Sequence, residues 1–319
     1  MTLKDNILYI VVPCYNEEAV LPETARRLLA KVNSLVSRGD IAPKSRILFV
    51  DDGSRDRTWA LIEDLSAGNP EVAGLKLAHN AGHQFALLAG LTAASARADM
   101  VISMDADLQD DIEAVDDFIA EYKRGADVVY GVRSSRKQDT VFKRGTAGLF
   151  YNLMKLLGVD IVANHADYRL MSKRALKVLL QFEEVDLFLR GVVPLVGFST
   201  AVVPYERHER FAGESKYPLK KMMAFALDGI TAFSIKPLRL ITGLGLLIFV
   251  GSILALFYLL VLKLTGNTVE GWTTLMGSIW ALGGIQLLCL GIAGEYIGRI
   301  YKQVKKRPRF IVETLTLRE

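Results

Sequence analysis

The chain has 319 residues, a formal net charge of +4 and a hydrophobic content of 51%. This length is sufficient for two structural units. The charge is modest, and the basic clusters are not interleaved with stacking aromatic residues, so the sequence argues against a nucleic-acid partner. The hydrophobic content is high for a soluble protein, and much of it lies in two uncharged runs near the C-terminus.

Short apolar segments alternate with amphipathic ones in the first part of the chain. Strands are predicted at 7–12, 47–50, 73–77, 100–104 and 127–130, and helices at 22–36, 58–65, 84–96 and 112–123. This alternation is typical of βαβ units, so it predicts an α/β fold with a mostly parallel sheet covered on both faces. Ligands of such sheets bind beyond the carboxyl ends of the strands.

Polar residues follow the first four predicted strands. The segments are Pro13-Cys14-Tyr15-Asn16-Glu17, Asp51-Asp52-Gly53-Ser54, His79-Asn80-Ala81-Gly82 and Asp105-Ala106-Asp107. Neither a dinucleotide-binding glycine fingerprint nor a P-loop occurs among them. Two carboxylates separated by one residue offer the oxygen ligands that Mg²⁺ or Mn²⁺ prefers. A turn or helix cap is the alternative for such an acidic pair taken alone.

Two further segments are basic. Residues 131–144 carry five cations, Arg133 among them, and form either a solvated loop or a basic lid near a membrane, before an interfacial helix expected near 146–158. Residues 204–217 place two arginines and a lysine around a glycine, which suits phosphate groups.

One carboxylate between these segments has several possible roles. Asp167 opens a strand-like stretch and is followed two residues later by Arg169. It could cap a helix, pair with Arg169 or act as a general base. Asp186 is its rival for the last role.

Two uncharged runs, Ile241–Leu262 and Gly271–Gly294, are each long enough to cross roughly 30 Å of hydrocarbon as a helix. They predict a transmembrane hairpin over 237–299, preceded by a juxtamembrane amphipathic helix at 218–236 and followed by a basic tail at 300–319. Basic residues flank both outer ends, so we expect the N-terminal part and both termini on the cytoplasmic side of the inner membrane. No signal peptide is expected at the N-terminus.

The order and spacing of these motifs resemble a known family. They include P-x-Y-N-E at 13–17, D-D-G-S at 51–54, N-x-G at 80–82, D-A-D-L-Q-D at 105–110, A-D-Y-R at 166–169 and R-x-x-G-x-S-K-Y at 210–217. With the two C-terminal runs, the chain is similar to the membrane-bound polyprenyl-phosphate glycosyltransferases of glycosyltransferase family 2. These include bactoprenol glucosyltransferases and, more distantly, dolichol-phosphate mannose synthases.

The resemblance implies a GT-A type nucleotide-sugar-binding domain over residues 1–217. It assigns donor binding to Pro13, Tyr15, Glu17, Asp52, Asn80, Asp105, Asp107 and Gln109, and a Mg²⁺ or Mn²⁺ ion to Asp107, Asp105 and Gln109. Phosphate or acceptor binding is expected at Arg133, Arg207, Arg210, Ser215 and Lys216, and catalytic roles at Asp107, Asp167 and Asp186.

The expected reaction is an inverting transfer of one sugar, glucose from UDP-glucose, to polyprenyl (undecaprenyl) phosphate. Phe188-Leu189-Arg190-Gly191 departs from the Q-x-x-R-W motif of processive synthases, which favours a single transfer. A GDP-mannose-dependent mannosyltransferase and a non-catalytic nucleotide-sugar-binding membrane protein are the alternatives. Membrane-facing amphipathic segments suggest a homo-oligomer.

Overall fold

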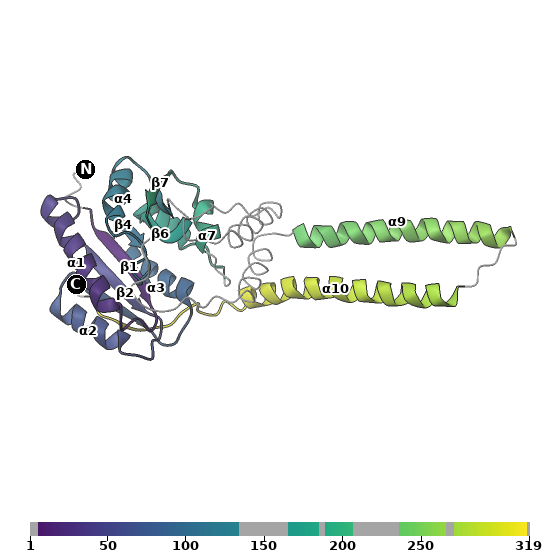
Figure 1. Ribbon diagram of the computed structural model, residues 1–319, viewed down its shortest axis with the longest axis horizontal. Coiled ribbons are helices and arrows are strands. Elements are labelled where there is room, and N and C mark those ends of the chain that lie inside the picture. The colour runs from purple at the N-terminus through teal and green to yellow at the C-terminus, as the bar shows by residue number, and fades with distance from the viewer. Residues whose placement is uncertain (1–5, 134–164, 185–188, 207–235, 266–270, 318–319) are drawn as a thin grey trace. The chain divides into compact units, whose positions relative to one another are not determined.

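The computed structural model describes residues 6–133, 165–184, 189–206, 236–265 and 271–317. The chain divides into two compact units (Figure 1). The first, here called the sheet unit, comprises 1–151, 161–217 and 308–319, and the second, the hairpin unit, comprises 152–160 and 218–307. The interfacial helix expected near 146–158 and nearly all of the helix expected at 218–236 lie outside the described residues.

A sheet of eight strands forms the centre of the sheet unit, in the order β7-β5-β6-β4-β1-β2-β3-β8. The strands are β1 (Leu8–Cys14), β2 (Arg46–Asp51), β3 (Val72–Leu77), β4 (Met100–Ser103), β5 (Val128–Arg133), β6 (His165–Ser172), β7 (Thr200–Tyr205) and β8 (Val312–Leu315). Strands β1 to β4 pair in parallel, as do β5 and β7, whereas β6 is antiparallel to both β4 and β5. The predicted α/β fold with a mostly parallel sheet is therefore confirmed.

Helices connect the strands as the βαβ pattern predicts. They are α1 (Leu21–Arg38), α2 (Thr58–Gly68), α3 (His83–Ser95), α4 (Ala114–Lys123), α6 (Lys173–Leu179), α7 (Leu189–Val192) and the 3₁₀ helix η2 (Val193–Val196). Helix α1 begins with Pro22 in its first turn, where the missing N–H costs no helical bond, and ends at Gly39, whose φ of 73° is a left-handed cap.

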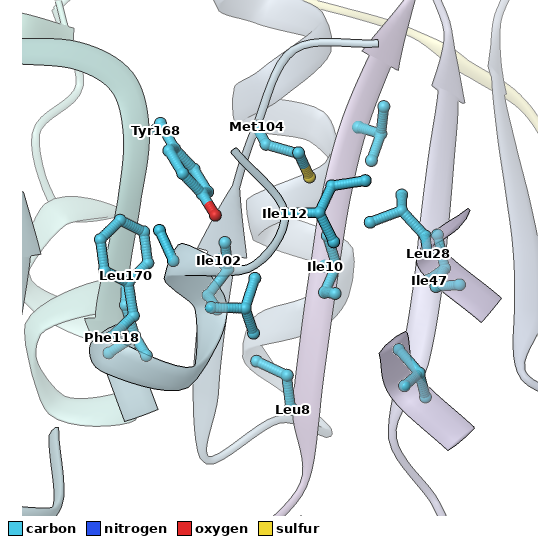
Figure 2. Close-up of a cluster of buried hydrophobic side chains, with 14 of the residues drawn as sticks. Leu8, Ile10, Leu28, Ile47, Ile102, Met104, Ile112, Phe118, Tyr168 and Leu170 are labelled. Atoms are coloured by element: carbon cyan, nitrogen blue, oxygen red, sulfur yellow. The ribbon is translucent and has the colours of Figure 1, made fainter. Parts of the chain in front are cut away.

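The two faces of the sheet are buried by different helices. Alternate residues of β1, Leu8, Ile10 and Val12, pack with Leu28 of α1 in one large core cluster. Figure 2 shows this cluster continuing across the sheet to Phe118 of α4 and to Tyr168 of β6, whose ring centroids lie 4.6 Å apart.

On the opposite face, α3 lies so close to β1 and β2 that a Cβ on Gly90 would come within 2.4 Å of Val11 and 2.7 Å of Val50. The interior positions of these strands are therefore apolar on both faces. Polar side chains from them can reach solvent only where the strands end.

The C-terminal segment returns to the sheet unit, although the sequence suggests only a basic tail at 300–319. Strand β8 pairs antiparallel with β3 and forms one edge of the sheet. The Thr316 backbone N–H donates to Gly74 O at 2.8 Å, and the Thr316 hydroxyl accepts from Gly74 N at 2.7 Å. Four residues of mixed polarity are too short to show a strand pattern by themselves, and the pairing becomes visible only in the folded chain.

The hairpin unit contains two long helices. Helix α9 spans Lys236–Leu264 and α10 spans Trp272–Val304, with residues 266–270 between them outside the described part. Helix α10 thus continues beyond the uncharged run into the basic segment. Among the residues whose placement is described, no helix combines the length and the apolar composition that crossing a membrane requires.

The β8 pairing predicts a measurable contribution from Thr316. Replacing Thr316 with Ala removes the acceptor of the Gly74 N–H and the 2.8 Å bond to the Ser66 hydroxyl. We expect the free energy of unfolding to fall by about 1–2 kcal/mol, measured by denaturant titration of the full chain in detergent. Thr314→Ala is the matched control, because the Thr314 side chain makes no hydrogen bond within the described residues. Equal stability of the two variants would contradict the assigned role of the Thr316 hydroxyl.

Candidate active site

Strand direction brings the predicted site residues to one edge of the sheet. The carboxyl ends of β1 to β5 and β7 meet there, and β6 begins at the same edge because it runs in the opposite sense. Ser103 of β4 pairs with Arg169 of β6. Extending that antiparallel register places Asp105 opposite Asp167. Residues predicted from separate motifs therefore share this edge, namely Tyr15, Glu17, Asp52, Asn80, Asp105, Asp107, Gln109, Arg133 and Asp167.

The acidic loop after β4, residues 105–110, alternates between accessible and buried positions. Asp105, Asp107 and Gln109 are half-buried, whereas Ala106, Leu108 and Asp110 are buried. Leu108 has a φ of 58°, a left-handed conformation that is costly for a leucine. The hydroxyl of Thr24 in α1 donates to Ala106 O at 2.8 Å and ties the loop to the first helix. The three predicted metal ligands consequently occupy the accessible positions of this loop.

The oxygen atoms of this loop are suitable ligands for a hard divalent cation. Two carboxylates and one amide oxygen are ligands that Mg²⁺ or Mn²⁺ accepts, and Mg²⁺ usually completes its shell with water and substrate phosphate. Asp105 Oδ1 is buried and has no hydrogen-bond partner among the described residues, which leaves an acceptor for such an ion. No group of three His, Cys, Asp or Glu side chains in the described chain is arranged to hold a metal. The ion would therefore depend on the mixed set of Asp105, Asp107 and Gln109.

The loops after β1 and β2 are joined to each other by hydrogen bonds. The Asn16 backbone N–H donates to Ser54 Oγ at 3.0 Å, Arg55 N donates to Asn16 Oδ1 at 2.9 Å, and Glu17 N donates to Thr58 Oγ1 at 2.9 Å. Asn16 has a φ of 55°, which asparagine tolerates better than most residues. This arrangement leaves Tyr15 42% exposed at the strand edge.

Pro13, also predicted to contact the donor, lies buried within β1 opposite Val50. Pro13 is therefore a residue of the strand itself, two positions before the exposed Tyr15.

Asp52 organises the loop after β3. Its two carboxylate oxygens accept from Ala81 N at 2.7 Å and from Gly82 N at 3.0 Å. Gly53, with a φ of 66°, lies so close to this loop that an added Cβ would come within 2.7 Å of Asn80 N. Asp52, which is predicted to bind the nucleotide-sugar donor, therefore also fixes the start of α3. Asn80 beside it is exposed.

Asp167 is surrounded by two arginines and a histidine. Arg169 Nη2 donates to its Oδ1 at 2.5 Å, Arg190 Nη2 donates to its Oδ2 at 3.0 Å, and His83 Nε2 lies 3.7 Å from Oδ2. His83 Nε2 also lies 3.6 Å from Asp105 Oδ1. Burial of the Asp167 carboxyl would raise its pKa, but His83, Arg169 and Arg190 outweigh that effect and hold the pKa well below its ordinary value. The ion pair with Arg169 that the sequence suggested is present, and the carboxylate is a weak base.

A second buried carboxylate connects the acidic loop to the ends of β5 and β7. The Tyr205 hydroxyl donates to Asp110 Oδ1 at 2.6 Å, and Arg133 Nε donates to the Tyr205 oxygen at 3.4 Å. Burial, with a contribution from the charge of Asp105, raises the pKa of Asp110 to about 6. Arg133, predicted to bind phosphate, is therefore held beside the acidic loop by Tyr205.

The remaining predicted residues lie outside the described part of the chain. These are Asp186, Arg207, Arg210, Ser215 and Lys216. Conversely, His83, Arg190 and Tyr205 belong to the site although the motifs did not assign them. His83 follows the N-x-G motif directly and could have been noticed there. Arg190 and Tyr205 lie in the segments 188–191 and 204–217 that the sequence singled out, but no local pattern there predicts that their side chains join this site.

Comparisons with known proteins agree with this geometry. The fold and the acidic strand edge define a GT-A type glycosyltransferase. Residues 9–180 match the family described as Glycosyl transferase family 2, and residues 236–300 match the GtrB C-terminal hairpin. The chain therefore belongs to glycosyl transferase family 2.

Relatives span nearly the whole chain. An uncharacterized glycosyltransferase of Bacillus subtilis, YkoT, is 55% identical over 96% of this chain and 91% of its own length. The SfII prophage-derived bactoprenol glucosyl transferase of Shigella flexneri is 41% identical, covering 95% of this chain and 96% of its own. Among solved structures, glucosyl-3-phosphoglycerate synthase from Mycobacterium tuberculosis with Mn²⁺ and UDP has 17% identity and a TM-score of 0.43, over 71% of this chain and 78% of that one.

The raised pKa of Asp110 predicts how stability depends on pH. Between about pH 4, near the unfolded value, and the folded value of about 6, the folded state binds more protons, so stability falls as the pH rises through this window. Asp110→Asn removes the charge and keeps an oxygen for Tyr205. We expect it to be more stable than the parent at pH 7 by roughly 1–3 kcal/mol and nearly equal at pH 4.

The measurement is thermal or denaturant unfolding in EDTA, because a bound cation would favour the ionised carboxyl. Asp64→Asn, an exposed carboxylate on α2, is the control. A parent and an Asp110→Asn variant with the same pH profile would refute the buried-charge explanation.

Proposed function

We propose that the protein transfers a single glucose from UDP-glucose to a polyprenyl phosphate, with inversion at the anomeric carbon. The observation that carries the proposal is the placement of Asp105, Asp107 and Asp167 at one strand edge of a family 2 glycosyltransferase. The name of the Shigella relative, which covers 95% of this chain, supports glucose as the sugar and bactoprenol phosphate as the acceptor class.

The donor is held by the strand ends already described. Tyr15 offers an exposed ring for the nucleobase, and Asp52 presents the ordered loop that carries Asn80. A divalent cation bound through Asp105, Asp107 and Gln109 would supply charge neutralisation for the diphosphate as the nucleoside diphosphate leaves. The acidic loop contributes its accessible carboxylates to this role.

The acceptor needs little help in losing a proton. A phosphate monoester is already an anion near pH 7, and its oxygen can attack the anomeric carbon directly. Asp167, with its depressed pKa and with Arg169, Arg190 and His83 around it, is better suited to orienting those neighbours than to removing a proton. We therefore assign Asp167 an orienting role.

A lipid acceptor also suggests a membrane location for the hairpin unit. The runs Ile241–Leu262 and Gly271–Gly294 carry no charged residue, and basic residues flank their outer ends. We propose that the segments containing these two runs anchor the enzyme in the cytoplasmic membrane, with residues 1–217 on the cytoplasmic side. A homo-oligomer remains a prediction from the sequence.

A transfer assay tests the proposed function. The full chain in lipid, with Mg²⁺ or Mn²⁺ and undecaprenyl phosphate, is offered radiolabelled UDP-glucose, UDP-galactose, UDP-N-acetylglucosamine and GDP-mannose in parallel. We expect labelled lipid with UDP-glucose. Product only with GDP-mannose would replace the donor assignment, and no product with any donor would refute the proposed activity.

The acidic loop is tested by Asp107→Ala. Loss of this ligand should lower turnover at least about a hundredfold, because the leaving group would lose its charge stabilisation. Removal of divalent cations with EDTA should have a similar effect on the parent and be reversed by added Mn²⁺ or Mg²⁺. Asp117→Ala, an exposed carboxylate on α4, is the control and should keep parental activity. Turnover by Asp107→Ala at the parental rate would exclude the assigned role.

A further inference from the structure

Two buried tyrosines hold the C-terminal end of the acidic loop. The Tyr205 hydroxyl of β7 donates to Asp110 Oδ1 at 2.6 Å. The Tyr168 hydroxyl of β6 donates to the carbonyl oxygen of Asp111, the residue directly after the loop, at 2.8 Å. Tyr168 is fully buried, and Tyr205 is only 3% exposed. Two strands therefore fix two consecutive residues at the point where the loop ends.

The two rings pack together although their strands are not neighbours. Strand β5 lies between β6 and β7 in the sheet, and it carries Gly131. A Cβ on Gly131 would come within 3.1 Å of both Tyr168 Cδ1 and Phe118 Cζ, so only glycine leaves room for these rings. The ring centroids of Tyr168 and Tyr205 lie 5.3 Å apart in an edge-to-face arrangement, which is favourable for aromatic pairs. Packing thus fixes the direction in which both hydroxyl groups point.

The centre of the acidic loop is strained and depends on such support. Leu108, with its φ of 58°, is buried in the core cluster. A leucine keeps this left-handed conformation only where its surroundings enforce it. The Thr24 hydroxyl holds the carbonyl oxygen of Ala106, two residues earlier, and Tyr205 holds Asp110, two residues later. Release of either side would let the backbone relax and would turn the residues next to Leu108.

Asp110 anchors the loop and is not one of its accessible ligands. It is 3% exposed, whereas Asp105, Asp107 and Gln109 are half-buried. Asp110 Oδ2 has no hydrogen-bond partner within the described residues. The orientation of this carboxyl group therefore depends on the bond from the Tyr205 hydroxyl to its other oxygen.

We propose that Tyr168 and Tyr205 are positioning residues for the divalent cation. Their hydroxyls hold the acidic loop in the conformation in which Asp105, Asp107 and Gln109 can bind the ion together. The proposal rests on the proposed function for the cation at this loop, but it is independent of the sugar and the acceptor. Loss of a group that orients metal ligands typically weakens metal binding by about 10–100-fold. The affinity for the ion should therefore depend on two hydroxyls that do not ligate it.

The test measures Mn²⁺ binding by the full chain in detergent, with and without UDP, from the EPR signal of free Mn²⁺. The variants are Tyr205→Phe and Tyr168→Phe, which each lose one hydroxyl and keep the packed ring. Ser172→Ala is the matched control. The Ser172 hydroxyl donates to the buried carboxylate of Asp127 at 2.7 Å and also caps α6, at the opposite edge of the sheet, where Ser172 pairs with Met100. The free energy of unfolding of each variant is measured in EDTA.

We expect Tyr205→Phe to raise the Kd for Mn²⁺ about tenfold or more. Tyr168→Phe should raise it at least about threefold, a smaller effect because a neutral carbonyl is a weaker acceptor than a carboxylate. Ser172→Ala should lose at least as much stability as the tyrosine variants and keep the Kd within about twofold of the parent. Similar losses of stability with unequal losses of Mn²⁺ affinity would separate positioning of the loop from a general effect on folding.

Kd values of both tyrosine variants within about twofold of the parent would overturn the proposal, as would a parent that binds no Mn²⁺ in either condition. Equal rises of the Kd in Tyr205→Phe and Ser172→Ala would also overturn it, because they would reflect lower stability alone. An unchanged Kd in one tyrosine variant would remove the positioning role of that residue. Parental Mn²⁺ binding by a chain that transfers no sugar would refute the proposed function and leave the roles of the two tyrosines valid.

Discussion

The site depends on one constraint, which is that the central strands are buried on both faces. Leu8, Ile10 and Val12 pack under α1, while Val11 and Val50 lie against α3 at Gly90. A charged group within these strands would be transferred from water into a close-packed apolar layer, which costs several kcal/mol unless it is paired. Polar residues are therefore confined to strand ends, and parallel alignment places those ends along one edge.

At this edge three buried carboxylates each have fixed hydrogen-bond donors. Asp52 is held by two backbone N–H groups, Asp110 by Tyr205, and Asp167 by Arg169 and Arg190. Each carboxylate is thereby fixed to another loop, strand or helix, so these contacts also hold the loops in place. The environments differ enough to separate the carboxyls chemically, since the pKa of Asp167 lies well below its ordinary value while that of Asp110 rises to about 6.

The sheet unit is built from separate segments of the chain, and the last of them contains the C-terminal strand β8. The chain leaves the unit before the hairpin helices and returns at residue 308, and β8 then covers the edge of β3. An uncovered edge strand exposes unpaired backbone groups to other chains. Strand β8 also fixes residues 312–315 to β3. The loop that follows β3 contains Asn80 and leads to His83.

Local pattern in the sequence determined the α/β class, most strand and helix positions, and the acidic loop with its oxygen ligands, because periodicity and strand-end chemistry are local properties. The two uncharged C-terminal runs can likewise be found from the sequence alone. Tertiary structure alone decided that Arg190 also binds the carboxylate of Asp167, that Tyr205 joins Asp110 to Arg133, and that residues 312–315 complete the sheet. These contacts join residues from separate elements, most of them far apart in the chain, and no periodicity records which distant side chains the strand order will bring together.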